Sequence, residues 1–430
     1  MSRQHSGPSA AKRFLGNTGW ILCERVLHLA LSLITTSLTA RYLGPSNAGL
    51  IDYGASFISI FTIVCKLGID SILVNEIIRN REDAGKLLGT TIGLRLLSSV
   101  AAVGMTAVAV LLLNPGKPLI LVITLIQSVS LLFVAFDTLD FWFQSQLQSR
   151  YTAMAKFISF LLVCGLRLTL VALRADVYWF ALATVTDAFI IGAMLLLFYR
   201  KTAAYPLKFS AATAKYLLAL SRPFILSALL ITVYTQMDKI MLGSMAGEHA
   251  VGIYDAAAKI CNMWMFVPIA VIDSARPMIM SARTTDRDGY LRRYRRLYAA
   301  IIWGNIAAAL AITLLARPII LLLYGEAFGE SIAVLPLLIW SRLFSLMGTT
   351  RGIWIVCEGY SRYVKFFAGG GAVLNLILNA WLIPVIGPLG AAVATLATEI
   401  FTALVLPLLF RETRPLGRIM LDAFLLRKLK

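Results

Sequence analysis

The chain has 430 residues, of which 59% are hydrophobic and 14% are charged, and its mean hydropathy is +0.79. A soluble protein of this length needs a larger polar surface, so the composition predicts an integral membrane protein. The formal net charge of +18 would suit nucleic-acid binding in a soluble protein. Here the basic residues lie in short connectors between apolar blocks, which indicates a topology signal and argues against nucleic acid as a partner.

The apolar residues form twelve blocks, each long enough to cross a bilayer as a helix, for which about 20 residues suffice. The first six predicted helices cover residues 16–40, 47–70, 88–113, 118–143, 151–173 and 177–199. The second six cover residues 215–243, 250–281, 297–323, 331–357, 361–385 and 388–410. Glycine–proline pairs such as Gly44-Pro45 and Gly387-Pro388 supply turns between consecutive helices.

Basic residues are distributed unequally between the two sides of the predicted bundle. The side that carries the N-terminus holds most of them, including the arginine-rich connector 282–296. The opposite connectors hold Arg41, Lys117 and Arg174. Because cytoplasmic connectors are the basic ones, both termini are predicted to be cytoplasmic. The polar segment 1–13 precedes the first helix without a small-residue cleavage site, so that helix is expected to be retained.

A short motif occurs in both halves of the chain. Gly49 to Asp52 opens the second predicted helix, and Gly252 to Asp255 opens the eighth. Since six helices separate the two copies, both halves have the same topology, as in transporters with parallel repeats. We therefore expect an all-α membrane protein with two six-helix lobes, related by a pseudo-two-fold axis parallel to the membrane normal. The predicted boundaries are 1–199 for the N-terminal lobe, 200–214 for a cytoplasmic linker, 215–410 for the C-terminal lobe and 411–430 for a basic cytoplasmic tail.

Ionisable side chains inside membrane helices are costly and mark candidate functional sites. Six cations lie in helices whose order allows them to face a shared cavity: Arg25, Arg222, Lys259, Arg276, Arg342 and Arg351. Guanidinium groups make forked, charge-assisted bonds to phosphate oxygens, so such a cavity suits a pyrophosphate. Four acids lie deep enough to take part in a proton- or sodium-coupled step: Asp187, Asp238, Asp255 and Glu399.

Charge pairing within the bundle is the competing explanation for several of these residues. Asp255 and Lys259 are four residues apart, and Asp273 and Arg276 are three apart, so each pair can neutralise itself on one helix face. Asp238 has the same option through the neighbouring Lys239.

Other classes of site have no support in the sequence. The cysteines and histidines are scattered singly, so no metal site is expected. No P-loop, hydrolase or metalloprotease motif occurs, which disfavours ATP-driven transport. The outer connectors are short, whereas a membrane glycosyltransferase or ligase would be expected to place its active site in an outer loop or domain.

Six segments resemble the polysaccharide repeat-unit flippases of the Wzx type, which handle O-antigen and exopolysaccharide units. These segments are Arg41–Pro45, Leu67–Val74, Asp140–Ser145, Asp238–Gly243, Val251–Tyr254 and Leu322–Gly325. The family belongs to the multidrug/oligosaccharidyl-lipid/polysaccharide exporter superfamily. The resemblance implies two six-helix lobes around a central cavity that opens alternately inward and outward.

The resemblance also implies a function. The substrate would be an undecaprenyl-pyrophosphate-linked oligosaccharide, moved across a bacterial inner membrane without enzymatic chemistry or a cofactor. Its partners would be membrane lipid and, further along, a polysaccharide polymerase and chain-length machinery. The positions at which this chain has the family's usual charge are Arg25, Asp238, Lys259 and Arg351. The positions at which it departs from the family pattern are Arg222, Asp255, Asp273 and Arg276.

Three rival functions stay open. A cation-coupled multidrug exporter of the same superfamily has the same architecture, although its cavity would be expected to carry acids and aromatic residues. A lipid II flippase usually has two further helices. A membrane enzyme of sugar-lipid metabolism would be identified by a turnover assay that shows bond formation or cleavage.

Overall fold

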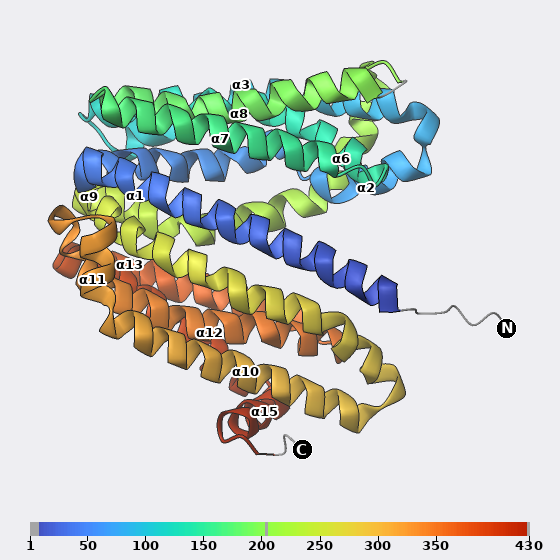
Figure 1. The fold of residues 1–430 in the computed structure, drawn as a ribbon, viewed down its shortest axis with the longest axis vertical. Helices are drawn as coiled ribbons and strands as arrows, with labels where there is room; N and C mark the ends of the chain where they lie inside the picture. The colour runs from blue at the N-terminus through green and yellow to red at the C-terminus, as the bar shows by residue number, and fades with distance from the viewer. Residues whose placement is uncertain (1–7, 203–204, 428–430) are drawn as a thin grey trace.

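The computed structural model describes residues 8–202 and 205–427. Side chains are described from residue 31 onward, except at 203–204, 226–227, 230–231, 284–285 and 428–430. The described part of the chain is helical throughout and contains no β-strand (Figure 1).

The N-terminal half consists of α1 and the elements up to α8. Their bounds are α1 Pro8–Lys66, α2 Asp70–Arg79, α3 Ala84–Leu113, α4 Pro118–Ser128, α5 Ser130–Val134, α6 Thr138–Ser145, α7 Arg150–Ala172 and α8 Val177–Thr202. Helix α1 is interrupted at Gly44, whose φ of 72° and ψ of 169° side-chain-bearing residues rarely adopt. The chain reverses there, so α1 makes two antiparallel passes (Figure 1).

The C-terminal half repeats this plan. Its bounds are α9 Ala211–Thr285, α10 Arg287–Leu314, α11 Ala316–Leu323, α12 Ser331–Cys357, α13 Val364–Ile400, α14 Leu406–Leu409 and α15 Arg414–Phe424. Helix α9 is interrupted at Gly247, with φ of 86° and ψ of 174°, much as α1 is at Gly44. Helix α13 is interrupted at Ile386 and Gly387.

Nine helical segments in the described chain are long and apolar enough to cross a membrane. Three of them, Leu31–Arg79, Thr232–Arg283 and Ser361–Leu409, are 49, 52 and 49 residues long. A straight helix of that size would measure about 75 Å, more than twice the roughly 30 Å hydrocarbon layer. Each contains one of the glycine interruptions at which α1, α9 and α13 turn back. Counted over the full length of these helices, each supplies two crossings, which confirms the prediction of about twelve membrane helices.

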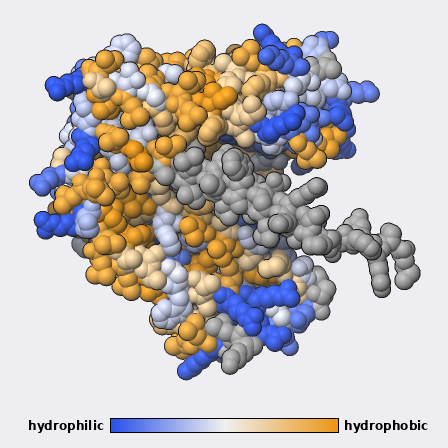
Figure 2. Space-filling model, viewed as in Figure 1, coloured by the Kyte–Doolittle hydropathy of each residue, from blue (hydrophilic) through white to orange (hydrophobic). Residues whose placement is uncertain are grey.

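The helices form two lobes, one from each half of the chain (Figure 1). The lobes meet at the end of the molecule that carries the turns at Gly44 and Gly247, which we call the glycine end. They separate toward the opposite end, at which the N-terminal end of α1 projects and which we call the terminal end (Figure 1). Hydrophilic residues gather at both ends, and the surface between them is mostly apolar, as expected for contact with lipid (Figure 2).

The two copies of the sequence motif face each other at the glycine end. A Cβ atom on Gly49 would lie 1.9 Å from the carbonyl oxygen of Glu248, and one on Gly252 would lie 2.0 Å from that of Pro45. Only glycine permits such close backbone contact. Gly44 and Gly247, Gly49 and Gly252, and Asp52 and Asp255 are all related by the same sequence offset. The two copies of the predicted repeat therefore form the backbone contact between the lobes.

Several elements differ from the predicted ones. Residues 118–143 form α4, α5 and α6 in place of one helix, and residues 297–323 are divided between α10 and α11. Helix α10 begins at Arg287 instead of residue 297, because the Asp286 side chain caps it by accepting a 2.9 Å hydrogen bond from the Gly289 amide. The basic tail contains the unpredicted helix α15, whose amphipathic pattern buries Leu416 and Met420 against the C-terminal lobe.

Candidate functional site

Four charged residues form a cluster between the lobes, which we call the inter-lobe cluster: Asp52 of α1 with Lys239, Asp255 and Lys259 of α9. The Lys259 Nζ lies 2.8 Å from Asp52 Oδ2 and 2.9 Å from Asp255 Oδ2. Lys239 pairs with Oδ1 of Asp255, whose side chain is 2% exposed. The expected pairing of Asp255 with Lys259 is thus present, and an acid from the other lobe extends it. The charges balance, which offsets part of the cost of removing them from water.

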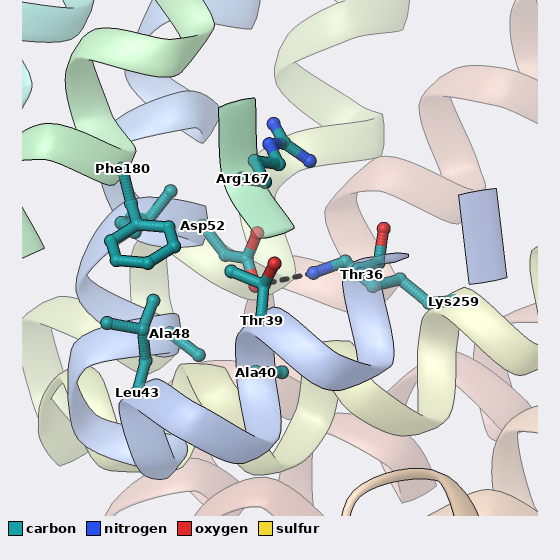
Figure 3. Close-up of a pocket in the computed structure, with 10 residues that line it drawn as sticks. Thr36, Thr39, Ala40, Leu43, Ala48, Asp52, Arg167, Phe180 and Lys259 are labelled. Atoms are coloured by element: carbon teal, nitrogen blue, oxygen red, sulfur yellow. Dashed lines mark hydrogen bonds and ion pairs between the residues drawn. The ribbon is translucent and has the colours of Figure 1, made fainter. Parts of the chain in front are cut away.

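A small cavity of about 70 Å³ adjoins this cluster (Figure 3). Lys259 enters it from the C-terminal lobe, and its other lining residues, among them Asp52, Phe180 and Arg167, belong to the N-terminal lobe. In Figure 3 Arg167 and Lys259 lie on different sides of Asp52. Arg167 makes no hydrogen bond or ion pair with any described residue.

A larger polar space lies inside the C-terminal lobe, and we call it the C-lobe cavity. It consists of two adjoining cavities of about 380 and 300 Å³ that share the wall residues Tyr234, Ser345 and Glu399. The first also contains Asp238, Lys239 and Arg342, and the second contains Arg351. Because Lys239 also belongs to the inter-lobe cluster, the two polar regions are continuous.

Asp238 is held by hydrogen bonds and has no lysine partner. Its Oδ2 accepts from the hydroxyls of Tyr254 at 2.9 Å and Thr395 at 2.7 Å. Its Oδ1 accepts from the Asn379 amide at 2.7 Å, and that amide also donates to Asn375 at 3.0 Å. The alternative in which Asp238 pairs with Lys239 is not found, since Lys239 pairs with Asp255.

The two arginines of the C-lobe cavity differ in their contacts. The Arg351 guanidinium lies 4.3 Å from the centre of the Phe367 ring and donates to the carbonyl oxygen of Thr402. Arg342 makes no hydrogen bond or ion pair with a described residue, and its Nε is buried without a partner. Arg342 is therefore the cation best placed to bind an anionic group in this cavity.

The other predicted site residues lie elsewhere. The side chain of Arg25 is outside the described residues. Arg222 is exposed, and Arg276 is half-exposed and pairs with Asp273 at 3.4 Å. Asp187 accepts a 2.5 Å hydrogen bond from Ser159 in the N-terminal lobe. Of the ten predicted residues, the structure brings together Lys259, Arg342, Arg351, Asp238, Asp255 and Glu399 around the two polar regions.

Sequence reasoning missed several polar residues of these regions, namely Asp52, Tyr254, Asn375, Asn379 and Thr395. Asp52 stands at the same place as Asp255 in the repeated motif, which was a usable signal. Asn375 and Asn379 are four residues apart in an otherwise apolar helix, which is a weaker signal.

The fold matches known membrane transporters. A lipid II flippase MurJ in an inward closed conformation superposes with a TM-score of 0.73 over 93% of this chain and 90% of that one, at 17% identity. An inward-facing multidrug resistance MATE family transporter of the MOP superfamily gives 0.68 over 92% and 95%, also at 17% identity. These likenesses show that this chain has the fold of MOP superfamily transporters.

Sequence comparison identifies the family. The chain is 32% identical over 173 residues to a probable flippase, AglR, from Haloferax volcanii. That match covers 38% of this chain and about a third, 35%, of the relative. The model of the polysaccharide biosynthesis protein family matches residues 14–281, which include the inter-lobe cluster and more than half of the chain. This chain is therefore a member of the polysaccharide biosynthesis protein family, with the all-helical fold of MOP superfamily transporters.

Proposed function

We propose that this protein is a flippase that moves undecaprenyl-pyrophosphate-linked oligosaccharide repeat units from the cytoplasmic to the periplasmic leaflet by alternating access. The observation that carries the proposal is the pair of guanidinium groups, Arg342 and Arg351, in the C-lobe cavity. Moving a multiply charged headgroup through hydrocarbon unaided has a prohibitive solvation cost. A polar cavity with forked donors for phosphate oxygens removes most of that cost.

The described conformation supports one half of such a cycle. The lobes are joined at the glycine end and separate toward the terminal end (Figure 1). We assign the terminal end to the cytoplasm because its connectors and tails are basic. The conformation is then inward-facing, and the prenyl tail stays in the bilayer while the sugars enter between the lobes. A bacterial inner membrane with both termini cytoplasmic is part of the proposal.

The acids supply candidates for ion coupling. Two lysines already compensate the charge of Asp255. Asp238 and Glu399 have no lysine or arginine within ion-pair distance among the described residues and both line the C-lobe cavity. A proton or sodium ion bound by one of these two would couple transport to an ion gradient.

The test is translocation of repeat units by an Arg342→Ala, Arg351→Ala double variant, normalised to folded protein in the membrane. Charge-assisted bonds of about 1.5–3 kcal/mol predict a roughly ten- to hundredfold fall at limiting substrate. The corresponding double lysine variant should recover only part of the activity, since an ammonium group lacks the planar fork. Arg200→Ala, an exposed cation at the end of α8, is the matched control and should behave as wild type.

A cation-coupled multidrug exporter is the second candidate, favoured by the structural likeness to the MATE family transporter and by the acids of the C-lobe cavity. Normal translocation by a well-folded double variant would contradict the flippase proposal. Loss of drug resistance in the same variant would support the exporter.

A further inference from the structure

Among the described residues, the inter-lobe cluster is the most buried ionic contact between the lobes at the glycine end. Asp52 and Lys259 have side chains 18% and 32% exposed. The other described ion pair that joins the lobes there, Lys117 with Glu248 at 3.6 Å, is more exposed at 46% and 37%. Exposed pairs contribute little to stability, so the Asp52–Lys259 pair is the stronger ionic link.

Opening the glycine end would divide the inter-lobe cluster unequally. Lys239, Asp255 and Lys259 all belong to α9 and would stay together, so Asp255 keeps its partners. Asp52 belongs to α1 and would lose its lysine. An unpaired carboxylate in a membrane-embedded cavity is costly, so the loss of Lys259 destabilises Asp52 in the separated state. The outward-facing state therefore needs a second cation for Asp52.

The N-terminal lobe contains a second cation beside the same cavity. Arg167 of α7 lines the cavity with Asp52 and, among the described residues, has no partner of its own. It lies on a different side of Asp52 from Lys259 (Figure 3). We propose that Asp52 exchanges Lys259 for Arg167 when the lobes separate at the glycine end. Arg167 then stabilises the outward-facing state, whereas Lys259 stabilises the inward-facing one.

This inference rests on the alternating access of the proposed function, but it does not depend on what is transported. It is tested without substrate, by distances between spin labels at Pro115→Cys and Ala327→Cys, which are exposed turn positions of the two lobes at the glycine end. The protein is the full chain in a cysteine-free background, in lipid nanodiscs. Lys259→Met should raise the population with the longer distance.

The decisive variant is Arg167→Gln in the Lys259→Met protein. The ratio of the long-distance population to the short-distance population should fall roughly tenfold, as expected for loss of one charge-assisted hydrogen bond. Arg167→Lys should restore most of the ratio, and the matched control Arg200→Gln should leave it unchanged. With Asp52→Asn also present, Arg167→Gln should have no further effect. In the otherwise wild-type protein, Arg167→Gln should leave thermal stability unchanged, because Arg167 makes no hydrogen bond or ion pair with a described residue in the inward-facing state.

Two results would overturn the proposal. One is a Lys259→Met protein that shows only the short distance. The other is a Lys259→Met protein that stays folded and shows the same ratio of long-distance to short-distance populations with and without Arg167→Gln. Failure of repeat-unit translocation with these distance shifts intact would instead reject the proposed substrate and leave the partner exchange standing.

Discussion

At the scale of single residues, the partners of a charge decide what it can do. Asp255 and Asp238 were equivalent candidates in the sequence. In the structure Asp255 is enclosed by two lysines, whereas Asp238 accepts three hydrogen bonds from neutral donors. A compensated acid holds structure together, whereas an acid whose hydrogen bonds come from neutral donors can still take up a cation.

This contrast predicts the behaviour of Asp238→Asn. The amide nitrogen can donate to the hydroxyls of Tyr254 and Thr395, which are able to accept, while the amide oxygen still accepts from Asn379. We therefore expect normal folding and transport that no longer depends on an imposed proton or sodium gradient, measured in vesicles.

Asp273→Asn is the control for this variant, because Asp273 is an exposed residue that pairs with Arg276. It should keep the gradient dependence. If Asp238→Asn and the matching Asp187, Asp255 and Glu399 variants all keep that dependence, none of these acids is a coupling residue.

At the scale of elements, the paired glycine turns shape both lobes. Gly44 and Gly247 reverse α1 and α9 with the same positive-φ backbone, and Gly49 and Gly252 then bring the following helices into backbone contact. The buried side chains around this contact come from both halves of the chain, among them Tyr53, Val251 and Ile253. The joined end is thus packed as a hydrophobic core in addition to its ionic link.

Gly252→Ala should loosen this contact. Its Cβ would meet the backbone of Pro45, which cannot move aside as a flexible side chain can. We expect a loss of about 1–3 kcal/mol in the inward-facing state, typical of overpacking, seen as a lower Tm in detergent.

Gly304→Ala in α10 is the matched change, since nothing lies within 4 Å of its added Cβ. It should be neutral or stabilise by up to ~1 kcal/mol through helix propensity. Equal Tm values for the two variants would mean that the lobes do not touch at Gly252.

At the scale of the whole molecule, orientation in the membrane determines which end is which. The basic connectors place the terminal end in the cytoplasm in our proposal. In a cysteine-free background, Ser46→Cys and Ala327→Cys should react with an impermeant thiol reagent added to sealed cells, and Ser361→Cys should not. All three positions are exposed in the structure, so burial does not confuse the comparison. Reaction at residue 361 alone would reverse the orientation and, with it, the direction assigned to the described conformation.

The sequence by itself determined the membrane class, the presence of about twelve crossings and the positions of the main turns. These properties depend on local hydropathy, on segment length and on the few residues that permit a positive φ, so they can be read along the chain. It also identified the repeated glycine motif, although not that its two copies touch.

Only the tertiary structure decided which charges meet. Lys259 has an acid four residues away, and no local rule indicates that it also reaches Asp52 in the other half of the chain. The same holds for Arg342, which lines a cavity without a hydrogen bond or ion pair to any described residue, and for Arg276, which proved to be paired on the surface. A helix presents charge on any side with equal ease, and the packing of helices from both halves determines which side faces a cavity.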